Sequence, residues 1–277
     1  MPELPEVETI RRQILPVTRQ LTIVAGQVTR ARAVRAHRSP EEFLALIIQR
    51  RILDIIRRGK VLLFLLDNDT SLLVRLGMSG RLGVAEACLP SLPHTHVQLT
   101  LSNGTELRFI DPRTFGQMAV VNGHDPDRMA ELGHYGLEPL SEAFTSQALA
   151  QALAGKKQLI QAVLMDQTKI AGLGKIYADE ACFLASVSPL RTAASLNTED
   201  IARLHAAIRQ VLEQSISARG TSTLDAAYRD ANGNKGDFQA KLYVYQRAQQ
   251  SCRVCGTLIE QRPLQGRRMH FCPRCQR

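Results

Sequence analysis

The sequence contains no tryptophan, and aromatic residues fill 5% of its 277 positions. It also lacks any run near the ~20 consecutive apolar residues that a membrane-spanning helix needs. The first residues, MPELPEVETIRR, contain no apolar core of a secretion signal. Internal repeats and low-complexity tracts are absent. We therefore expect a cytoplasmic protein with no membrane partner, and the 44% of hydrophobic residues suffices to bury a core.

Charge is unevenly distributed along the chain. Residues 1–147 contain 17 lysines and arginines against 16 aspartates and glutamates, whereas residues 148–277 contain 18 against 10. The net charge of +9 therefore arises almost entirely from the second half. A basic region beside a near-neutral one is typical of proteins that bind a polyanion, usually nucleic acid. A solvated basic surface without such a partner is the alternative.

Cysteine is scarce and mostly confined to the last 26 residues. Cys252, Cys255, Cys272 and Cys275 form two CxxC pairs separated by 16 residues. In a chain without a secretion signal this spacing predicts one structural zinc ion held by four thiolates, in a β-hairpin ribbon. A pair of disulfides is the alternative. Cys88 and Cys182 are isolated in apolar surroundings, so we expect both in the core.

The first 135 residues predict a mostly β domain with two helices. A helix is expected over residues 5–15, ended by Pro16, and another from the capping box at Ser39 to about Gln49. Short strands are expected in ILDIIRR, KVLLFLLDN, SLLVRLGM, HVQLTL, ELRFI and GQMAVV, with hairpin turns at Gly59 and at Ser102-Asn103-Gly104. Antiparallel strands without intervening helices indicate a sandwich or a barrel.

The pattern becomes helical after about residue 136. Helices are expected in SEAFTSQALAQAL, KQLIQAVLMD, KIYADEACFLA and TEDIARLHAAIRQVLEQSISARG, followed by a polar loop over 221–240 that is mobile by composition. Between the second and third helices lies the glycine-bearing turn 171–174, with Lys175 opening the next helix. Free backbone N–H groups at a helix start can bind phosphate. An ordinary turn between two helices is the alternative.

The N-terminus offers an unusual nucleophile. A small second residue such as Pro2 permits removal of Met1, which would leave a secondary amine. Terminal amines have pKa values of about 7.7–8.0, so a useful fraction is neutral at physiological pH. The start of the following helix would further disfavour the protonated form. Such a nitrogen can attack a sugar C1′ and form a Schiff base, with Glu3 beside it as an acid or base. An ordinary Pro-Glu start is the alternative.

The sequence closely resembles the formamidopyrimidine-DNA glycosylase family over essentially its whole length. The resemblance is carried by MPELPEVETIRR, RRGK, LGMSGRL, HTHVQLTLSNG, DPRTFG, LEPLSEAF, MDQTKIAGLGKIYADE and GRRMHFCPRCQR. It implies an α+β protein with an antiparallel β-sandwich domain (1–135), a helix–two-turn–helix DNA-binding domain (136–240) and a zinc finger (241–277). It also implies a monomeric bacterial repair enzyme at the nucleoid. That enzyme flips damaged purines out of duplex DNA, because C1′ cannot be reached inside the stack.

The resemblance also implies roles for individual residues. The catalytic set would be the nucleophile Pro2, the acid Glu3, the phosphate-contacting Lys60 and the finger residue Arg267. Met78, Arg113 and Phe115 would fill the gap left by the flipped base. The remaining DNA-contacting or orienting positions would be Glu6, His94, Lys156 and Lys175. The implied activity is excision of 8-oxoguanine and formamidopyrimidines, followed by β,δ-elimination.

Two positions depart from the family pattern. Lys175 stands where the family turn usually has asparagine, and Gln161 stands where the preceding helix usually has lysine. Both changes put lesion preference and turnover in question more than the fold. An enzyme of the endonuclease VIII type, which favours oxidised pyrimidines, is one alternative, although PELPEVE rather than PEGPE argues against it. A non-catalytic binder of damaged DNA is the other, opposed by the presence of Pro2, Glu3, Lys60 and Arg267.

Overall fold

The computed structural model describes residues 2–223, 228–264 and 266–277. The chain divides into two compact units, of which the first comprises Met1–Gly133 and Ala218–Gln239 and the second His134–Ser217 and Ala240–Arg277. The segment 218–239, which we expected in the helical domain 136–240, thus belongs to the first unit. Hydrogen bonds from Thr221 to Glu6 and between Gln13 and Asp230 attach it there.

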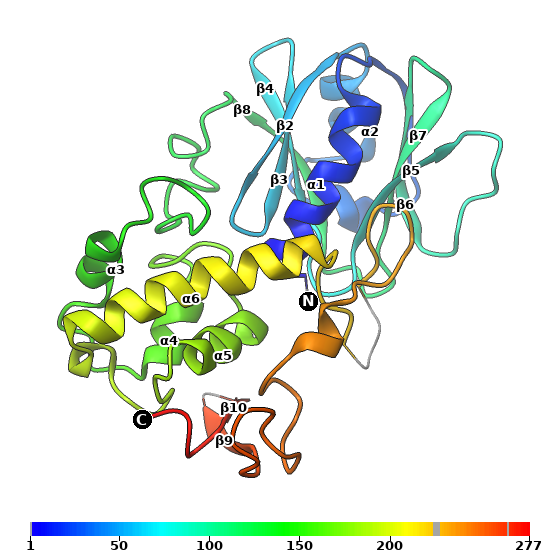
Figure 1. Cartoon of the computed structure of the whole chain (residues 1–277). Coiled ribbons are helices and arrows are strands. Elements are labelled where there is room, and N and C mark those ends of the chain that lie inside the picture. The colour runs from blue at the N-terminus through cyan, green and yellow to red at the C-terminus, as the bar shows by residue number, and fades with distance from the viewer. Residues whose placement is uncertain (1, 224–227, 265) are drawn as a thin grey trace. The chain divides into compact units, whose positions relative to one another are not determined.

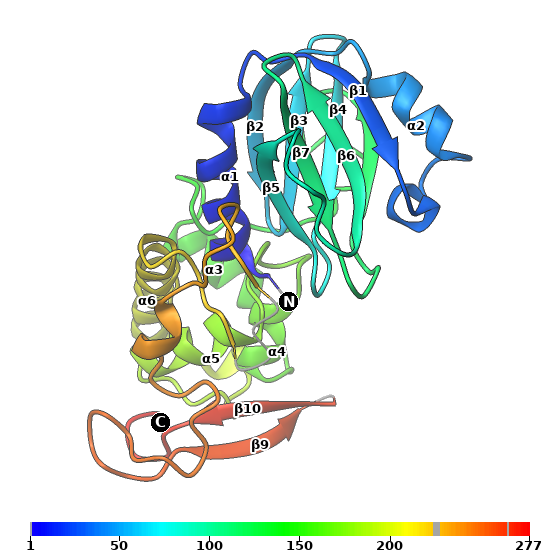
Figure 2. The ribbon, with the colours of Figure 1, turned by 90° about the vertical axis from the view of Figure 1, so that its right-hand side faces the viewer.

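The first unit contains two four-stranded antiparallel sheets that face each other (Figure 2). Their strands are β1 (Ile23–Val28), β2 (Ile52–Arg58), β3 (Val61–Leu66), β4 (Thr70–Arg75), β5 (Arg81–Glu86), β6 (Thr95–Leu101), β7 (Thr105–Ile110) and β8 (Gln117–Asn122). The strand orders are β1-β6-β7-β5 and β2-β3-β4-β8. The inner faces bury Val97, Leu99 and Phe109 against Leu62, Phe64 and Leu72. The antiparallel sandwich expected from the sequence is therefore confirmed.

Both predicted hairpins are present. Strands β2 and β3 pair through Arg58 and Val61, with Gly59 at φ 57° in the turn. Gly104, at φ 82°, occupies the turn between β6 and β7. The strands β1 and β5 were not predicted. Each contains a glycine and few buried side chains, because each lies at a sheet edge, so neither shows a clear apolar alternation.

Helices cover the open edges of the sandwich. Helix α1 (Leu4–Thr18) contacts the edge strands β2 and β5, and α2 (Pro40–Ile47) contacts β1 and β8. Figure 2 shows α1 beside β2 and α2 beside β1. Covering edges in this way blocks unwanted strand pairing. The helix α1 runs past Pro16, contrary to our expectation. Pro16 lies in the last turn, where the Thr18 hydroxyl still donates to the Ile14 carbonyl and the Arg19 N–H donates to the Leu15 carbonyl.

The second unit is helical with one β-hairpin (Figure 1). Its elements are α3 (Ser146–Leu153), α4 (Ile160–Met165), α5 (Lys175–Leu184), α6 (Thr198–Ser217), β9 (Glu260–Leu264) and β10 (Arg267–Phe271). All four expected helices exist, although α3 and α4 begin later than predicted. Helix α5 is buried along most of its length and packs on α4, α6 and β10. The predicted β-hairpin ribbon is formed by β9 and β10, paired in register from Arg267 opposite Leu264.

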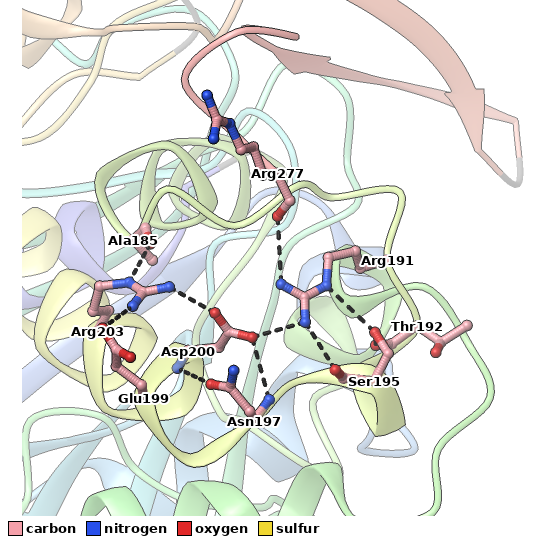
Figure 3. Close-up of polar contacts among 9 residues, drawn as sticks. All are labelled: Ala185, Arg191, Thr192, Ser195, Asn197, Glu199, Asp200, Arg203 and Arg277. Atoms are coloured by element: carbon pink, nitrogen blue, oxygen red, sulfur yellow. Dashed lines mark hydrogen bonds and ion pairs between the residues drawn. The ribbon is translucent and has the colours of Figure 1, made fainter.

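A polar network joins the start of α6 to the end of α5 (Figure 3). Asp200 is 5% exposed and accepts hydrogen bonds from Arg191 at 2.7 Å and Arg203 at 2.6 Å. Arg203 Nε also donates to the Ala185 carbonyl at the end of α5. Burial raises the pKa of Asp200, but the hydrogen bonds and charges of the two arginines outweigh it and hold that pKa below its usual value. The network therefore fixes the first turns of α6 relative to the end of α5 and to the loop between the two helices.

Within the described ranges, no helix combines the length and the apolar character needed to cross a membrane.

Candidate active site

The N-terminal turn of α1 holds three of the predicted site residues. Pro2 is buried, and Glu3 is the N-cap residue of α1 at 4% exposure. The Glu3 backbone N–H donates to Glu6 Oε2 at 2.7 Å. Because the first helical N–H groups carry a partial positive charge, this position favours anions and disfavours protonated amines. While Met1 remains attached, the Pro2 nitrogen is an amide and cannot act as a nucleophile.

Glu6 connects that turn to the segment 218–239. The side chain is 1% exposed, and its Oε1 accepts the Thr221 N–H at 2.8 Å. Gly220 lies so close that a Cβ there would come within 2.9 Å of Glu6 Oε1. Glu6 therefore accepts two backbone hydrogen bonds, one through each carboxylate oxygen.

Lys60 lies directly after Gly59 in the β2–β3 turn of the same unit. The side chain is partly exposed. Arg57 Nη1 donates to the Gly59 carbonyl at 3.1 Å, so the turn is held from inside the unit.

Met78, Arg113 and Phe115 lie on two turns that the structure joins. The carboxylate of Asp111 accepts hydrogen bonds from Ser79 Oγ and from the backbone N–H groups of Arg113 and Gly116. Gly77 has φ 66° and packs directly against Gly116. A Cβ added to Gly77 would lie 2.6 Å from the Gly116 nitrogen. Met78 and Phe115 are 39% and 46% exposed, which is unusual for large apolar side chains. The Arg113 guanidinium stands 5.1 Å from the Phe115 ring centre.

His94 lies beside this pair of turns. It is exposed, has φ 67°, and its carbonyl accepts the Asp111 N–H at 3.0 Å. The structure therefore gathers four of the predicted DNA-contacting residues around Asp111.

Two arginines that we did not single out from the sequence support the second turn. Arg35 donates to the carbonyls of Gly116 at 2.7 Å and Phe115 at 3.3 Å, and Arg32 donates to the carbonyl of Thr114 at 3.1 Å. Both come from the 3-10 helix region at Ala31–Arg35. No motif marks them, because arginine–carbonyl contacts carry no sequence spacing.

In the second unit, the glycine-bearing turn leads into α5 as predicted. Gly174 is the N-cap residue of α5, and the side chain of Gln167 bonds to the Gly172 N–H and the Leu173 carbonyl. The Lys175 ammonium stands 4.7 Å from the centre of the Tyr245 ring. Lys156 is partly exposed in the α3–α4 connection.

Gln161, the second departure from the family pattern, points inward rather than to solvent. It is 1% exposed and donates to Asp179 of α5. The other carboxylate oxygen of Asp179 accepts the His270 backbone N–H at 3.1 Å and lies 3.0 Å from Nδ1 of the same residue. The neighbouring Glu180 accepts the N–H groups of Tyr243, Val244 and Tyr245 at 2.8–2.9 Å. Asp179 thus attaches the C-terminal hairpin to α5, and Glu180 attaches the preceding segment 243–245.

The four cysteines at the C-terminus form a candidate metal centre. Their sulfur atoms all lie within 4.8 Å of one another, with Cys252–Cys275 at 3.9 Å and Cys255–Cys272 at 3.5 Å. These distances are far beyond a disulfide bond. A tetrahedral ion bonded to four sulfurs at about 2.3 Å requires sulfur separations of about 3.8 Å, so the cluster fits one metal ion. Cys182 is buried as predicted, whereas Cys88 is exposed, because its loop lies on the surface.

Two parts of the expected site are described only in part. Residues 224–227 of the predicted loop are not described. Arg267 is described by its backbone alone, which pairs with Leu264 in the hairpin.

Family models match both units. The model of the formamidopyrimidine-DNA glycosylase N-terminal domain matches residues 1–118, and that of the formamidopyrimidine-DNA glycosylase H2TH domain matches residues 135–226.

Similar proteins and solved structures span the whole chain. The formamidopyrimidine-DNA glycosylase of Geobacillus kaustophilus is 44% identical over 277 residues, 100% of each chain. That of Moorella thermoacetica is 45% identical over 260 residues, 94% of each chain. The solved MutM (Fpg) protein of Thermus thermophilus matches with a TM-score of 0.87 and 40% identity, over 99% of this chain and 98% of that one. The Lactococcus lactis Fpg bound to abasic-site DNA matches with a TM-score of 0.87 and 30% identity, over 99% of each chain.

The fold, the helix–two-turn–helix match and the four-cysteine cluster define a two-domain DNA-repair glycosylase with a C-terminal cysteine cluster. The chain belongs to the formamidopyrimidine-DNA glycosylase family. It is therefore an enzyme that acts on damaged DNA.

Proposed function

We propose that this enzyme excises 8-oxoguanine and formamidopyrimidines from duplex DNA and then cleaves the strand, with the nitrogen of Pro2 as nucleophile. One observation carries the proposal: Pro2 directly precedes Glu3, which is the buried N-cap residue of α1 and donates its backbone N–H to Glu6. A secondary amine freed by removal of Met1 would be kept largely neutral there.

The Pro2 nitrogen attacks C1′ of the flipped nucleotide. The bond from nitrogen to C1′ forms, the bond from C1′ to the base breaks, and the base leaves with a proton. Glu3 donates a proton to the sugar ring oxygen as the ring opens, which leaves an iminium ion. The iminium acidifies C2′, and two successive eliminations expel the 3′ and then the 5′ phosphate. Water then hydrolyses the bond between C1′ and the Pro2 nitrogen, which frees the amine and releases the sugar remnant as an unsaturated aldehyde. A one-nucleotide gap with phosphate at both ends remains.

The other predicted residues would bind and shape the DNA. Lys60 and Arg267 contact phosphates at the lesion and assist the eliminations, and Met78, Arg113 and Phe115 fill the gap left by the flipped base. Supporting this, the exposed apolar side chains of Met78 and Phe115 stand on two turns that both bond to the Asp111 carboxylate. His94, Lys156 and Lys175 contact the DNA backbone. We propose that the protein acts as a monomer on chromosomal DNA in the cytoplasm.

We propose that the metal ion of the four-cysteine cluster is zinc. Four thiolates leave no open coordination position, so the ion would be structural. It would stabilise the fold of the finger that carries Arg267, and this chain's own residues would perform every step of the reaction.

The test is borohydride trapping on duplexes that contain 8-oxoguanine, followed by mass mapping of the attached residue. We expect a covalent adduct on the Pro2 nitrogen. An extended variant in which a lysine between Met1 and Pro2 blocks removal of the methionine should give no adduct at Pro2. Equal trapping by this blocked variant would disprove the nucleophile. A duplex with thymine glycol, cleaved faster than the 8-oxoguanine duplex, would instead indicate an enzyme for oxidised pyrimidines.

A further inference from the structure

One buried carboxylate on α1 collects three arginines. Glu8 is 5% exposed, and it accepts two hydrogen bonds from Arg11 at 2.8 and 3.0 Å and one from Arg12 at 2.8 Å. The third partner, Arg57, comes from β2 and donates through Nε at 3.1 Å. Arg11 and Arg12 follow Glu8 on the helix, at positions i+3 and i+4 where such pairs meet. Arg57 is different, because it lies on the strand that runs into the β2–β3 turn and not on the helix.

Arg57 extends this link to the turn that carries Lys60. Its Nη1 donates to the Gly59 carbonyl at 3.1 Å, and its side chain is 6% exposed. The Gly59 carbonyl belongs to the peptide unit that contains the Lys60 nitrogen. A continuous chain of hydrogen bonds therefore runs from Glu8 through Arg57 to the peptide of Lys60.

The need to neutralise the Glu8 carboxylate does not explain why Arg57 is buried beside it. Two arginines from the same helix already pair with the carboxylate, whereas burying a third guanidinium carries a desolvation cost. What Arg57 adds is the bond to Gly59. Glu8 stands five residues after Glu3 on a continuous helix, so its position is fixed relative to the N-terminal turn.

We propose that Glu8 and Arg57 are positioning residues that hold Lys60 in register with Pro2 and Glu3. The inference rests on the proposed function, in which Pro2 attacks the sugar while Lys60 contacts the adjacent phosphate. Two groups that act on one nucleotide must keep their separation, since a displacement of about 1 Å can slow a reaction by about 100-fold. Glu8 and Arg57 are 49 residues apart in sequence, and their contact joins α1 to the strand that leads into the β2–β3 turn.

The test compares four variants in single-turnover assays on an 8-oxoguanine duplex, with duplex affinity and melting temperature measured in parallel. Arg57→Met removes both bonds, and Arg57→Lys keeps the charge but not the fork that reaches two acceptors. Glu8→Gln takes the Glu8 carboxylate away from the buried Arg57 guanidinium. The double variant Glu8→Gln/Arg57→Met removes the buried guanidinium as well. Arg19→Met is the control, because Arg19 also joins α1 to β2, by a bond to the Leu53 carbonyl, away from Lys60.

We expect the three variants of Arg57, including the double, to cleave about 10- to 100-fold more slowly, with duplex affinity changed less than about threefold. The double variant should recover the melting temperature lost in Glu8→Gln but not the rate. Arg19→Met should cleave at the parental rate. If the double variant recovered the cleavage rate as well as the melting temperature, the pair would only stabilise the fold and the proposal would be overturned. Cleavage by Arg57→Met at the rate of the parental protein would also overturn it.

The proposed function fails separately. If the parental protein gives no borohydride adduct at Pro2, the nucleophile is wrong and this inference falls with it. If the parental protein gives the adduct and the variants cleave normally, the positioning role alone is overturned.

Discussion

Glu6 Oε1 accepts a hydrogen bond from the backbone N–H of Thr221 at 2.8 Å, across 215 residues of sequence. The other oxygen accepts the N–H of Glu3 at 2.7 Å. One buried carboxylate therefore joins the turn that carries the proposed nucleophile to the segment 218–239. A second attachment is made by Gln13, which bonds to the Asp230 carboxylate and to the Ala231 N–H.

Gly220→Ala should disturb this junction. Gly220 has φ +83°, and an added Cβ would meet Glu6 Oε1 at 2.9 Å and Tyr228 at 3.1 Å. Gly104→Ala is the matched control, because Gly104 has φ +82° with nothing within 4 Å of the added atom. Backbone strain of about 1–2 kcal/mol is common to both. We expect both variants to melt at lower temperature and Gly220→Ala alone to excise 8-oxoguanine more slowly; equal excision rates would contradict the role given to this contact.

Arg35→Met should loosen the turn that presents Arg113 and Phe115. The substitution removes two hydrogen bonds to backbone carbonyls, each contributing about 1 kcal/mol. We expect base excision to slow by roughly 5- to 30-fold. Arg38→Met, at an exposed position three residues on, is the control. The measurement is the single-turnover excision rate on an 8-oxoguanine duplex. A rate unchanged from that of the parental protein would show that the turn keeps its shape without Arg35.

The sequence predicted those elements whose local signals agree with their surroundings. The β2–β3 and β6–β7 hairpins have strong apolar strands on both sides of a glycine turn, so both were predicted correctly. The edge strands β1 and β5 were not predicted, because their side chains are partly exposed and their pairing depends on residues distant in sequence. Pro16 was expected to end α1. In the last turn of a helix, however, a proline costs only one backbone hydrogen bond, and the helix continues to Thr18.

The candidate site divides in the same way. Pro2, Glu3 and the cysteines stand in compact motifs and could be named from the sequence. Arg32 and Arg35 could not, because their roles arise from contacts with carbonyls about 80 residues away. The assignment of 218–239 to the first unit likewise depends on Glu6 and Gln13, whose partners no local pattern reveals.

The Glu8 cluster should make stability depend on acid pH. Burial raises the pKa of Glu8, but hydrogen bonds from Arg11 and Arg12 and the charge of Arg57 outweigh it, so that the pKa falls from 4.5 to about 2. The folded state therefore binds this proton less readily than the unfolded state. The stabilisation is complete above about pH 4.5 and is lost as the pH falls toward 2. In chemical denaturation between pH 2 and 6, Glu8→Gln should show a shallower loss of stability than the parental protein. Glu142→Gln, at an exposed position, should not.

Cys272→Ser should release the metal ion and with it the placement of the hairpin. The Cys272 thiol is buried and lies 3.5 Å from that of Cys255, so a hydroxyl there leaves three thiolates for the ion. Structural zinc contributes about 10–16 kcal/mol to the folding of small finger peptides, and most of this depends on the full ligand set. We expect one zinc per parental chain by metal analysis and much less in the variant, together with weaker binding to a lesion duplex. Cys88→Ser, which replaces an exposed thiol, should retain both. If Cys272→Ser kept its zinc and its affinity, the four cysteines would not form the metal site. If it lost zinc but bound DNA normally, the hairpin would be held by Asp179 without help from the ion.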